Sequence, residues 1–362
     1  MTGLAERLAE RTLELVDIPS ESRHEAKVRE RLLTLVPSSL VADYASDDAF
    51  LFTPERRHGV PLVVLAGHYD TVPAQGNLPG RIDDGSVHGL GSSDMKGGLA
   101  VALELVRDLA AAEPGPYDVG LLLFGREELP ADHNPLPALF TGSSAIHDTS
   151  LAIVLEPTDG RIQAGCLGNL VANLTFHGTS GHAARPWLAD NAIDRAVAGL
   201  GSVVSLARRE AVVGGLTFFE VITLTRLQAG IADNVIPDRA TAMLNFRYPP
   251  DRTADEAEGY LRSLVPDGAT LEIVSNAAPG AVVTGSPLVD ALRRAGGLEI
   301  EPKQAWTNVA DFTANGIDAI NFGPGHTAYA HRRDERVEIA ALVHAYETLH
   351  RFLTDGIGED AE

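Results

Sequence analysis

His68 and Asp70 have the types and the spacing of a metal-binding imidazole with a supporting carboxylate. Because they are two residues apart, an extended chain points both side chains to the same side. A carboxylate in that position fixes the tautomer of a metal-binding histidine and raises its basicity. The pair follows the apolar run at residues 63–65, which predicts a buried strand. A histidine alone is more often structural than a ligand, so a metal site needs further candidates.

Asp94 is the next candidate and lies in the glycine-rich run GSSDMKGG at residues 91–98. The apolar run at residues 99–109 predicts a helix directly after it. A glycine-flanked turn into a helix holds a side chain at a fixed point, although an aspartate there also suits a helix cap. Because His68 lies at the end of another apolar element, the two together favour a metal site.

Three more acidic residues follow two further predicted buried strands, at residues 119–124 and 151–155: Glu127, Glu128 and Glu156. A Glu-Glu pair alone is typical of a solvated helix face, and a Glu-Pro step alone is typical of a strand exit. Three apolar strands that each end near an acidic residue favour a shared site over three coincidences.

His331 lies in a loop after the predicted strand at residues 319–322 and gives the set a second imidazole. Imidazoles and carboxylates without cysteine suit zinc, with cobalt or manganese as alternatives. A catalytic zinc ion generally has three protein ligands and an open position. The candidate ligands are too many for one such ion, so they predict two ions ~3.5–4 Å apart that share a carboxylate. A hydroxide would bridge the ions, and a nearby carboxylate would act as general base. The spacing leaves open which of Glu127 and Glu128 is the base and which is the ligand.

The composition limits the class of protein. A length of 362 residues favours two domains, and 44% hydrophobic with 22% charged residues is typical of a globular protein. The net charge of −21 argues against nucleic acids and anionic membranes as partners. The single cysteine, Cys166, excludes an intrachain disulfide and a thiolate zinc cluster. Residues 1–16 lack the apolar segment of a signal peptide and no run reaches the ~18 apolar residues of a membrane span, so we expect a cytoplasmic protein.

The order of the predicted elements indicates an α/β protein with an inserted domain. Residues 168–282 follow the order β-α-β-β-α-β, the ferredoxin-like pattern of a four-stranded sheet with two helices on one face. Residues 1–167 and 283–362 then form a metal-binding catalytic domain, a mixed sheet with helices on both faces. We also expect a proline-rich loop at residues 131–139 and disorder in the acidic tail at residues 358–362.

Seven motifs together resemble those of the dinuclear zinc aminoacylase and carboxypeptidase family: HYDTVP at 68–73, GSSDMKGG at 91–98, GREE at 125–128, LEP at 155–157, GTSGHAARP at 178–186, DNVIPD at 233–238 and GPG with AHRRDE at 323–335. The resemblance covers essentially the whole chain. It implies two zinc sites that share Asp94, one completed by His68 and Glu156, the other by Glu128 and His331.

The same resemblance implies that Glu127 is the general base and that Asp70 orients His68. It also implies that the inserted domain is a lid and the surface of a homodimer, through which a histidine of the partner chain stabilises the oxyanion. His182 matches the position of that histidine. Without the resemblance, a surface loop would be the simpler interpretation of His182.

Substrate contacts are implied for Asn234 and Arg247, which match lid positions that contact the amino-acid portion of the substrate. Arg185 departs from the family pattern, in which many members carry an aromatic residue. Residues 165–167 depart as well, because an arginine-rich segment is usual there. Arg185 is therefore a candidate for a carboxylate of the substrate, and Arg247 with Arg185 would clamp a doubly charged substrate.

The run at residues 306–312 and the ending at 323–335 look most like the actinobacterial type of succinyl-diaminopimelate desuccinylase. The expected reaction is the metal-dependent hydrolysis of N-succinyl-LL-2,6-diaminopimelate to succinate and LL-2,6-diaminopimelate, a step of lysine biosynthesis. The alternatives are an acetylornithine deacetylase or another N-acyl-amino-acid amidohydrolase or carboxypeptidase. A non-catalytic binding protein on the same fold is a more remote alternative, because it predicts a missing ligand or base.

Overall fold

The computed structural model describes residues 3–46 and 48–356, and the chain forms two compact units. The first unit contains the residues up to 165, residues 283–301 and the residues from 308 onward. The second contains residues 166–282 and 302–307. Residues 166, 167 and 302–307, which the sequence analysis placed in the first domain, group with the second because backbone bonds hold them there. Gly280 N donates to Cys166 O (3.2 Å) and Leu167 N donates to Ala305 O (3.0 Å).

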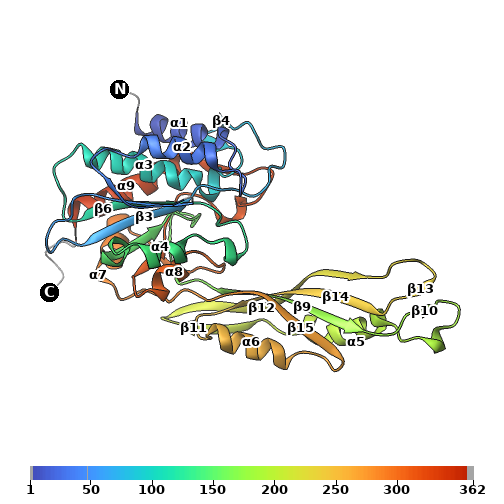
Figure 1. Ribbon diagram of the computed structural model, residues 1–362. Helices are drawn as coiled ribbons and strands as arrows, with labels where there is room; N and C mark the ends of the chain where they lie inside the picture. The colour runs from blue at the N-terminus through green and yellow to red at the C-terminus, as the bar shows by residue number, and fades with distance from the viewer. Residues whose placement is uncertain (1–2, 47, 357–362) are drawn as a thin grey trace. The chain divides into compact units, whose positions relative to one another are not determined.

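An eight-stranded mixed sheet forms the centre of the first unit, in the order β1-β2-β6-β3-β7-β17-β8-β16 (Figure 1). Strands β6, β3, β7 and β17 run parallel to one another, whereas β1, β2 and β8 pair antiparallel with their neighbours. Every residue of β3 is buried, as expected for a strand covered on both faces. The strands are β1 (Val41–Ala45), β2 (Ala49–Thr53), β3 (Leu62–His68), β6 (Asp118–Phe124), β7 (Thr149–Val154), β8 (Ile162–Ala164), β16 (Ile300–Pro302) and β17 (Ala319–Asn321).

Helices cover both faces of this sheet (Figure 1). Helices α1, α3 and α9 pack against one another over one face, while α4 and α8 lie on the other. The α-helices are α1 (Leu4–Asp17), α2 (Ala26–Leu35), α3 (Gly97–Ala110), α4 (Leu136–Gly142), α7 (Pro287–Gly296), α8 (Val309–Ala314) and α9 (Ile339–Asp355). Short helical turns are η1 (Ser92–Lys96), η2 (Ala131–His133), η3 (Ala145–Asp148) and η5 (Thr327–Tyr329). The α/β architecture expected from the sequence is confirmed.

A small antiparallel sheet, in the order β18-β5-β4, adds to the first unit. Its strands are β4 (Arg81–Asp83), β5 (Ser86–His88) and β18 (Arg336–Glu338). Because β18 pairs with β5, this sheet brings the segment that follows His331 next to the segment that precedes η1. It therefore helps to place two stretches that carry candidate ligands.

The second unit is an antiparallel sheet in the order β11-β12-β14-β9-β15, with α5 and α6 packed on one face. A two-stranded sheet of β10 and β13 lies at one end of it (Figure 1). Alternate residues of β9 and β14 point toward the helices and form its core, as the period of a strand requires. The elements are β9 (Gly168–His177), β10 (Gly181–His182), η4 (Pro186–Leu188), α5 (Ala192–Val204), β11 (Arg209–Val213), β12 (Leu216–Ala229), β13 (Val235–Ile236), β14 (Arg239–Tyr248), α6 (Ala254–Ser263) and β15 (Ala269–Ala277).

The structure differs from the sequence expectations in a few elements. Strand β11 adds a fifth strand to the ferredoxin-like sheet, because residues 209–213 form a hairpin with the start of β12. The stretch at residues 131–139 is not a loop throughout, since it contains η2 and the first turn of α4, where Pro137 is tolerated. The tail expected to be disordered, residues 358–362, lies outside the described residues. Of the helices in the described part of the chain, each is too short or too polar to cross a bilayer.

Candidate functional site

The candidate ligands of the first unit come together because parallel strands end at one edge of the sheet. His68 is the last residue of β3, and it pairs in register with Phe124, the last residue of β6. Glu127 and Glu128 therefore follow β6 at the same edge, and Glu156 follows β7, the other neighbour of β3. In α/β sheets this edge is the usual place for binding and catalytic groups.

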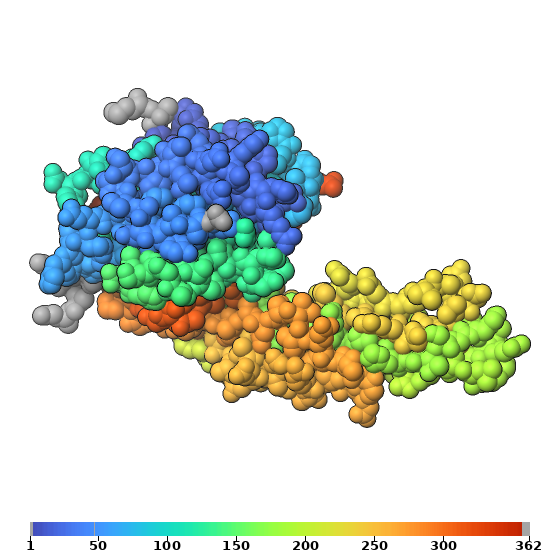
Figure 2. Space-filling view, in the orientation of Figure 1, coloured from blue at the N-terminus to red at the C-terminus, as the bar shows by residue number. Residues whose placement is uncertain are grey.

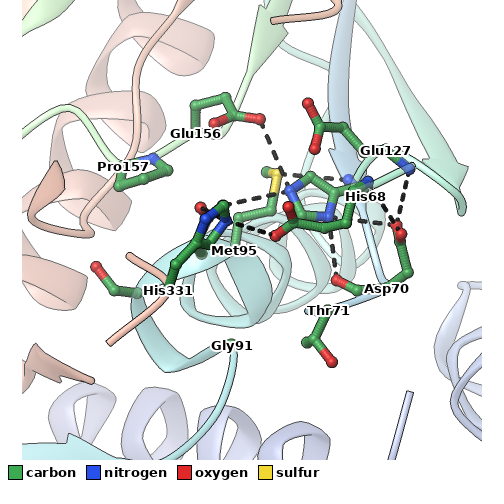
Figure 3. A network of polar contacts seen from close by, with 12 residues as sticks. His68, Asp70, Thr71, Gly91, Met95, Glu127, Glu156, Pro157 and His331 are labelled. Atoms are coloured by element: carbon green, nitrogen blue, oxygen red, sulfur yellow. Dashed lines mark hydrogen bonds and ion pairs between the residues drawn. The ribbon is translucent and has the colours of Figure 1, made fainter. Parts of the chain in front are cut away.

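The first candidate metal group consists of His68, Asp94 and Glu156, whose ligand atoms all lie within 4.8 Å of one another. His68 Nε2 is 3.3 Å from Asp94 Oδ1 and 3.7 Å from Glu156 Oε1. His68 and Glu156 are 1% and 6% exposed, so their charges have little contact with water. Figure 3 shows Glu156 pointing toward the His68 ring, and the two residues come from different strand ends.

The second group consists of Asp94, Glu128 and His331, again within 4.8 Å. His331 Nε2 is 2.9 Å from Glu128 Oε1 and 3.5 Å from Asp94 Oδ2. The two oxygens of Asp94 thus approach different imidazoles, as required of a carboxylate shared by two ions. The hydrogen bond with Glu128 raises the pKa of His331 to about 9. His331 is more exposed than His68, so this group lies on the solvent side of the first.

Asp70 is fully buried behind His68. Its Oδ1 is 3.5 Å from His68 Nδ1, and its own carbonyl oxygen is 3.2 Å from the same nitrogen. The carboxylate also accepts hydrogen bonds from the backbone N–H of Glu127 (3.1 Å) and of Glu128 (3.2 Å), and from Ser22 Oγ (2.7 Å). Asp70 thus holds the His68 ring and the turn that carries both glutamates.

Asp94 lies inside η1, with φ −124° and ψ 93°, and η1 leads directly into α3. Met95, the next residue, places its Sδ 3.4 Å from His68 N, which ties the turn to the end of β3. The backbone N–H of Asp94 donates to Glu335 Oε1 (3.0 Å). Glycine is required at residue 91, whose φ is +78° and where an added Cβ would lie 2.8 Å from a methyl of Thr71.

Glu127 lies among the other acidic groups. Burial raises the pKa of Glu127 well above its ordinary value of 4.5; His68 opposes this shift, while the charges of Glu156 and Glu128 add to it. In contrast, burial would raise the pKa of Asp70, but its contacts with His68 and Ser22 hold that pKa below the ordinary value. The pKa values of Glu127 and Asp70 are thus shifted in opposite directions, although Asp70 accepts a hydrogen bond from the backbone of Glu127.

The donor set fits a pair of divalent cations. Carboxylates crowded at one sheet edge repel one another, and this repulsion adds to burial in raising the pKa of Glu127. Two dications held by His68, Glu156, Asp94, Glu128 and His331 would offset this negative charge, and imidazole with carboxylate is a ligand type suited to zinc, cobalt and manganese.

The remaining predicted residues lie in the second unit, where His182 and Asn234 meet at the pairing of β10 with β13. His182 is opposite Val235 in that pairing, and Ala183 N donates to Asn234 O (3.0 Å). Arg185 lies next to them, and its backbone N–H donates to His182 O (2.8 Å). The two segments that carry these residues lie side by side at the end of the second unit (Figure 2).

Arg247 is not part of this cluster. It lies near the far end of β14, eight residues after Arg239, which is about 26 Å along the strand. Its Nε donates to Asn245 Oδ1 (2.8 Å). The structure therefore brings His182, Arg185 and Asn234 together and keeps Arg247 apart from them within one chain.

Three residues that support the site were not predicted from the sequence. Glu335 accepts hydrogen bonds from the turn that carries Asp94, Gln75 Nε2 donates to His331 O (3.0 Å), and Ser22 holds Asp70. The signal available for Glu335 was its place in the motif AHRRDE beside His331, and the structure shows that it is 2% exposed. Gln75 and Ser22 lie in loops whose paths the sequence pattern does not indicate.

Comparison with known proteins adds a family assignment to this geometry. The model of peptidase family M20/M25/M40 matches residues 64–355. A Mycobacterium tuberculosis protein that is provisionally named succinyl-diaminopimelate desuccinylase is 36% identical over 347 residues, covering 95% of this chain and 97% of that one. The succinyl-diaminopimelate desuccinylase of Corynebacterium glutamicum is 35% identical over 364 residues, covering 95% of each chain.

A solved structure has the same fold. The YXEP protein of Bacillus subtilis, a dinuclear metal-binding peptidase of the M20 family, superposes with a TM-score of 0.65. The superposition covers 96% of this chain and 97% of that chain at 16% identity. The sequence match and the fold therefore point to the same family.

Proposed function

Because this chain belongs to peptidase family M20/M25/M40, we propose that it hydrolyses N-succinyl-LL-2,6-diaminopimelate to succinate and LL-2,6-diaminopimelate. The observation that carries the proposal is the convergence of both ligand groups on Asp94 in a chain that is 35% identical to a named desuccinylase along almost its whole length. This reaction would serve lysine biosynthesis in the cytoplasm.

The proposed chemistry is the addition of water to the amide carbonyl, followed by cleavage of the carbon–nitrogen bond. Two divalent cations, which we propose to be zinc, would polarise the carbonyl and lower the pKa of the attacking water. His68, Glu156, Asp94, Glu128 and His331 would hold these cations.

Glu127 would take the proton from the attacking water and deliver it to the leaving amine nitrogen, as a general base and then a general acid. Asp70 would keep the His68 ring and the backbone of Glu127 in place, because it contacts both. Glu128 differs from Glu127 in its direct contact with His331, which favours Glu128 as the ligand.

We propose that residues 168–282 act as the lid and that the enzyme is a homodimer. Helix α5 supports this: its inner face packs on the sheet, yet Val197 and Val204 on it are 67% and 56% exposed, and Trp187 before it is 75% exposed. Exposed apolar side chains of this kind gather at protein–protein interfaces. Sedimentation of the wild type should show a dimer, and Val197→Asp should shift it toward the monomer.

A dimer also accounts for the separation of His182, on β10, from Arg247, which lies near the far end of β14. We propose that His182 and Asn234 serve the site of the partner chain, where His182 stabilises the oxyanion. Arg247 would serve the site of its own chain by pairing with a carboxylate of the substrate, and Arg185 is a second candidate for such a pair.

The second candidate function is the hydrolysis of another N-acyl amino acid, such as N-acetylornithine, since Arg185 departs from the pattern of many desuccinylases. The test is kcat/KM on N-succinyl-LL-2,6-diaminopimelate and on N-acetylornithine with the same zinc-reconstituted protein. A preference for the succinylated substrate supports the proposal. Equal or higher kcat/KM on N-acetylornithine overturns it in favour of the second candidate, and turnover of neither substrate by metal-loaded protein overturns both.

A further inference from the structure

Glu335 has a buried carboxylate, and both of its oxygens accept hydrogen bonds from the backbone of one turn. Glu335 Oε1 accepts from Ser93 N and from Asp94 N, each at 3.0 Å, and Oε2 accepts from Gly91 N at 2.9 Å. The residue is 2% exposed. Three N–H groups from four consecutive residues therefore converge on one side chain, in the segment that carries the shared candidate ligand.

Burying a carboxylate is costly unless hydrogen bonds replace its lost hydration. Three hydrogen bonds from backbone donors replace part of that hydration, and they are directional. The same bonds fix the path of residues 91–94, because moving the Asp94 backbone would break the bond from its own N–H. Neither the packing of an apolar residue nor a water molecule at this place would fix the turn in the same way.

Glu335 also belongs to the loop that carries His331. Glu335 N donates to Arg332 O (3.3 Å), and Gly89 N donates to Glu335 O (3.1 Å), so its backbone is fixed on both sides. The other end of this loop is held by Gln75 and Asn77, whose side-chain amides donate to His331 O (3.0 Å) and Arg332 O (3.3 Å). His331 itself has φ +61°, a conformation that a histidine keeps only where its surroundings impose it.

We infer that Glu335 is the positioning residue that sets the distance between Asp94 and His331, and so couples the two candidate metal groups. It joins the turn that carries the shared carboxylate to the loop that carries a ligand found only in the second group. The inference rests on one part of the proposed function, that Asp94 and His331 are metal ligands. It assigns to Glu335 no contact with the ions or with the substrate.

The direct test is Glu335→Gln, with Asp334→Asn as the matched control. Gln has one acceptor oxygen, so it can keep the bonds from Ser93 and Asp94 only by turning an NH2 group toward the N–H of Gly91. Asp334 is the neighbouring carboxylate, is about half exposed, and pairs with Arg332 rather than with the turn. The control therefore converts a neighbouring carboxylate of the same loop to an amide without touching residues 91–94.

The readout is the affinity for Zn²⁺ and Co²⁺, measured by calorimetric titration of the metal-free full-length protein, together with the visible absorption of the Co²⁺ form. Loss of residues that support ligands generally weakens metal binding by about 10–100-fold. We expect that loss for Glu335→Gln, with an altered Co²⁺ spectrum, and wild-type values for Asp334→Asn. Wild-type metal affinity and an unchanged spectrum in folded Glu335→Gln would overturn the inference.

Glu335→Asp keeps the test decisive if Glu335→Gln does not fold. Its carboxylate is one methylene shorter, so it should restore part of the metal affinity. A variant with lowered thermal stability but wild-type affinity would show that Glu335 supports only the fold, and would also overturn the inference. Because these readouts use metal alone, they stand apart from the proposed reaction: wild type that binds two ions but fails to cleave the succinylated substrate contradicts only the latter.

Discussion

Glu128 and His331 are 203 residues apart in the chain, yet Glu128 Oε1 and His331 Nε2 are 2.9 Å apart. Glu128 follows β6, whereas His331 lies in a loop after β17, and the parallel strands of the sheet bring both to one edge. The contact matters for function because Asp94, the carboxylate shared by the two candidate groups, places its Oδ2 3.5 Å from the same imidazole. This pair of distant residues thus completes, with Asp94, the second candidate metal group.

The two adjacent glutamates should respond differently to the same substitution. Glu127→Gln should retain two metal ions and lower kcat by about 10²–10⁴-fold, the usual contribution of general acid–base catalysis. Glu128→Gln should instead weaken metal binding, because Glu128 contacts His331 in the second group. Metal analysis beside steady-state kinetics distinguishes the two. If Glu127→Gln loses metal and Glu128→Gln keeps it, the roles are reversed.

His182→Asn tests the proposed oxyanion contact from the lid. Removing one donor to an oxyanion generally lowers kcat by about 10²–10³-fold, and we expect a fall of that size with unchanged metal content. His177 is a matched control, because it lies on β9 of the same unit and its Nε2 contacts Thr270 Oγ1 (3.0 Å). His177→Asn should leave kcat near the wild-type value. A loss of metal with little loss of kcat would make His182 structural.

Arg247→Ala should raise KM for the succinylated substrate more than it lowers kcat. A hydrogen bond between charged groups contributes about 1.5–3 kcal/mol, which corresponds to about 10–150-fold in affinity. Arg185→Ala, measured in parallel, shows which of the two arginines meets the substrate anion. Unchanged KM in Arg247→Ala for both succinylated and acetylated substrates would exclude Arg247 from substrate binding.

The second unit should lose stability in acid through Glu220, which is 4% exposed. Burial raises the pKa of Glu220, but hydrogen bonds from Arg209 (2.6 Å) and Arg252 (2.7 Å) outweigh it, so the pKa is below the ordinary value of 4.5. Because the folded-state pKa is the lower one, this stabilisation is fully present above 4.5. It is lost as the pH falls from there through the folded-state value.

Glu220→Gln should therefore reduce the free energy of unfolding at pH 7 by about 1.5–3 kcal/mol and flatten its decline below pH 4.5. Glu210→Gln is the control, since Glu210 pairs with Arg208 at the surface, where a salt bridge contributes about 0–1 kcal/mol. Denaturant unfolding between pH 7 and pH 3 measures both. An identical pH dependence in Glu220→Gln and wild type would refute this account of the cluster.

Much of the fold follows from local patterns in the sequence. The apolar runs of β3, β6 and β7 predict buried strands, and the acidic residues after them predict a shared edge. Strand β11 was missed because residues 209–213 mix charged and apolar side chains and depend on pairing with β12. The prolines at residues 131–139 predict a loop, although Pro137 lies in the first turn of α4.

The candidate ligands were identifiable because each lies next to a recognisable element, whereas the groups that hold them were not. Glu335 acts on backbone N–H groups about 240 residues away, and backbone donors leave no trace in a sequence. The orientation of Asp70 toward two glutamate N–H groups is hidden for the same reason. Tertiary hydrogen bonds of this kind require the folded structure.

We propose that each chain binds two divalent cations and requires both for amide hydrolysis. The most direct measurement is metal content by elemental analysis, paired with turnover of N-succinyl-LL-2,6-diaminopimelate, in chelated and zinc-reconstituted protein. We expect no turnover after chelation, and recovery of activity as the zinc content rises to two ions per chain. Full turnover by metal-free protein, or failure to bind more than one ion under saturating zinc, would contradict it.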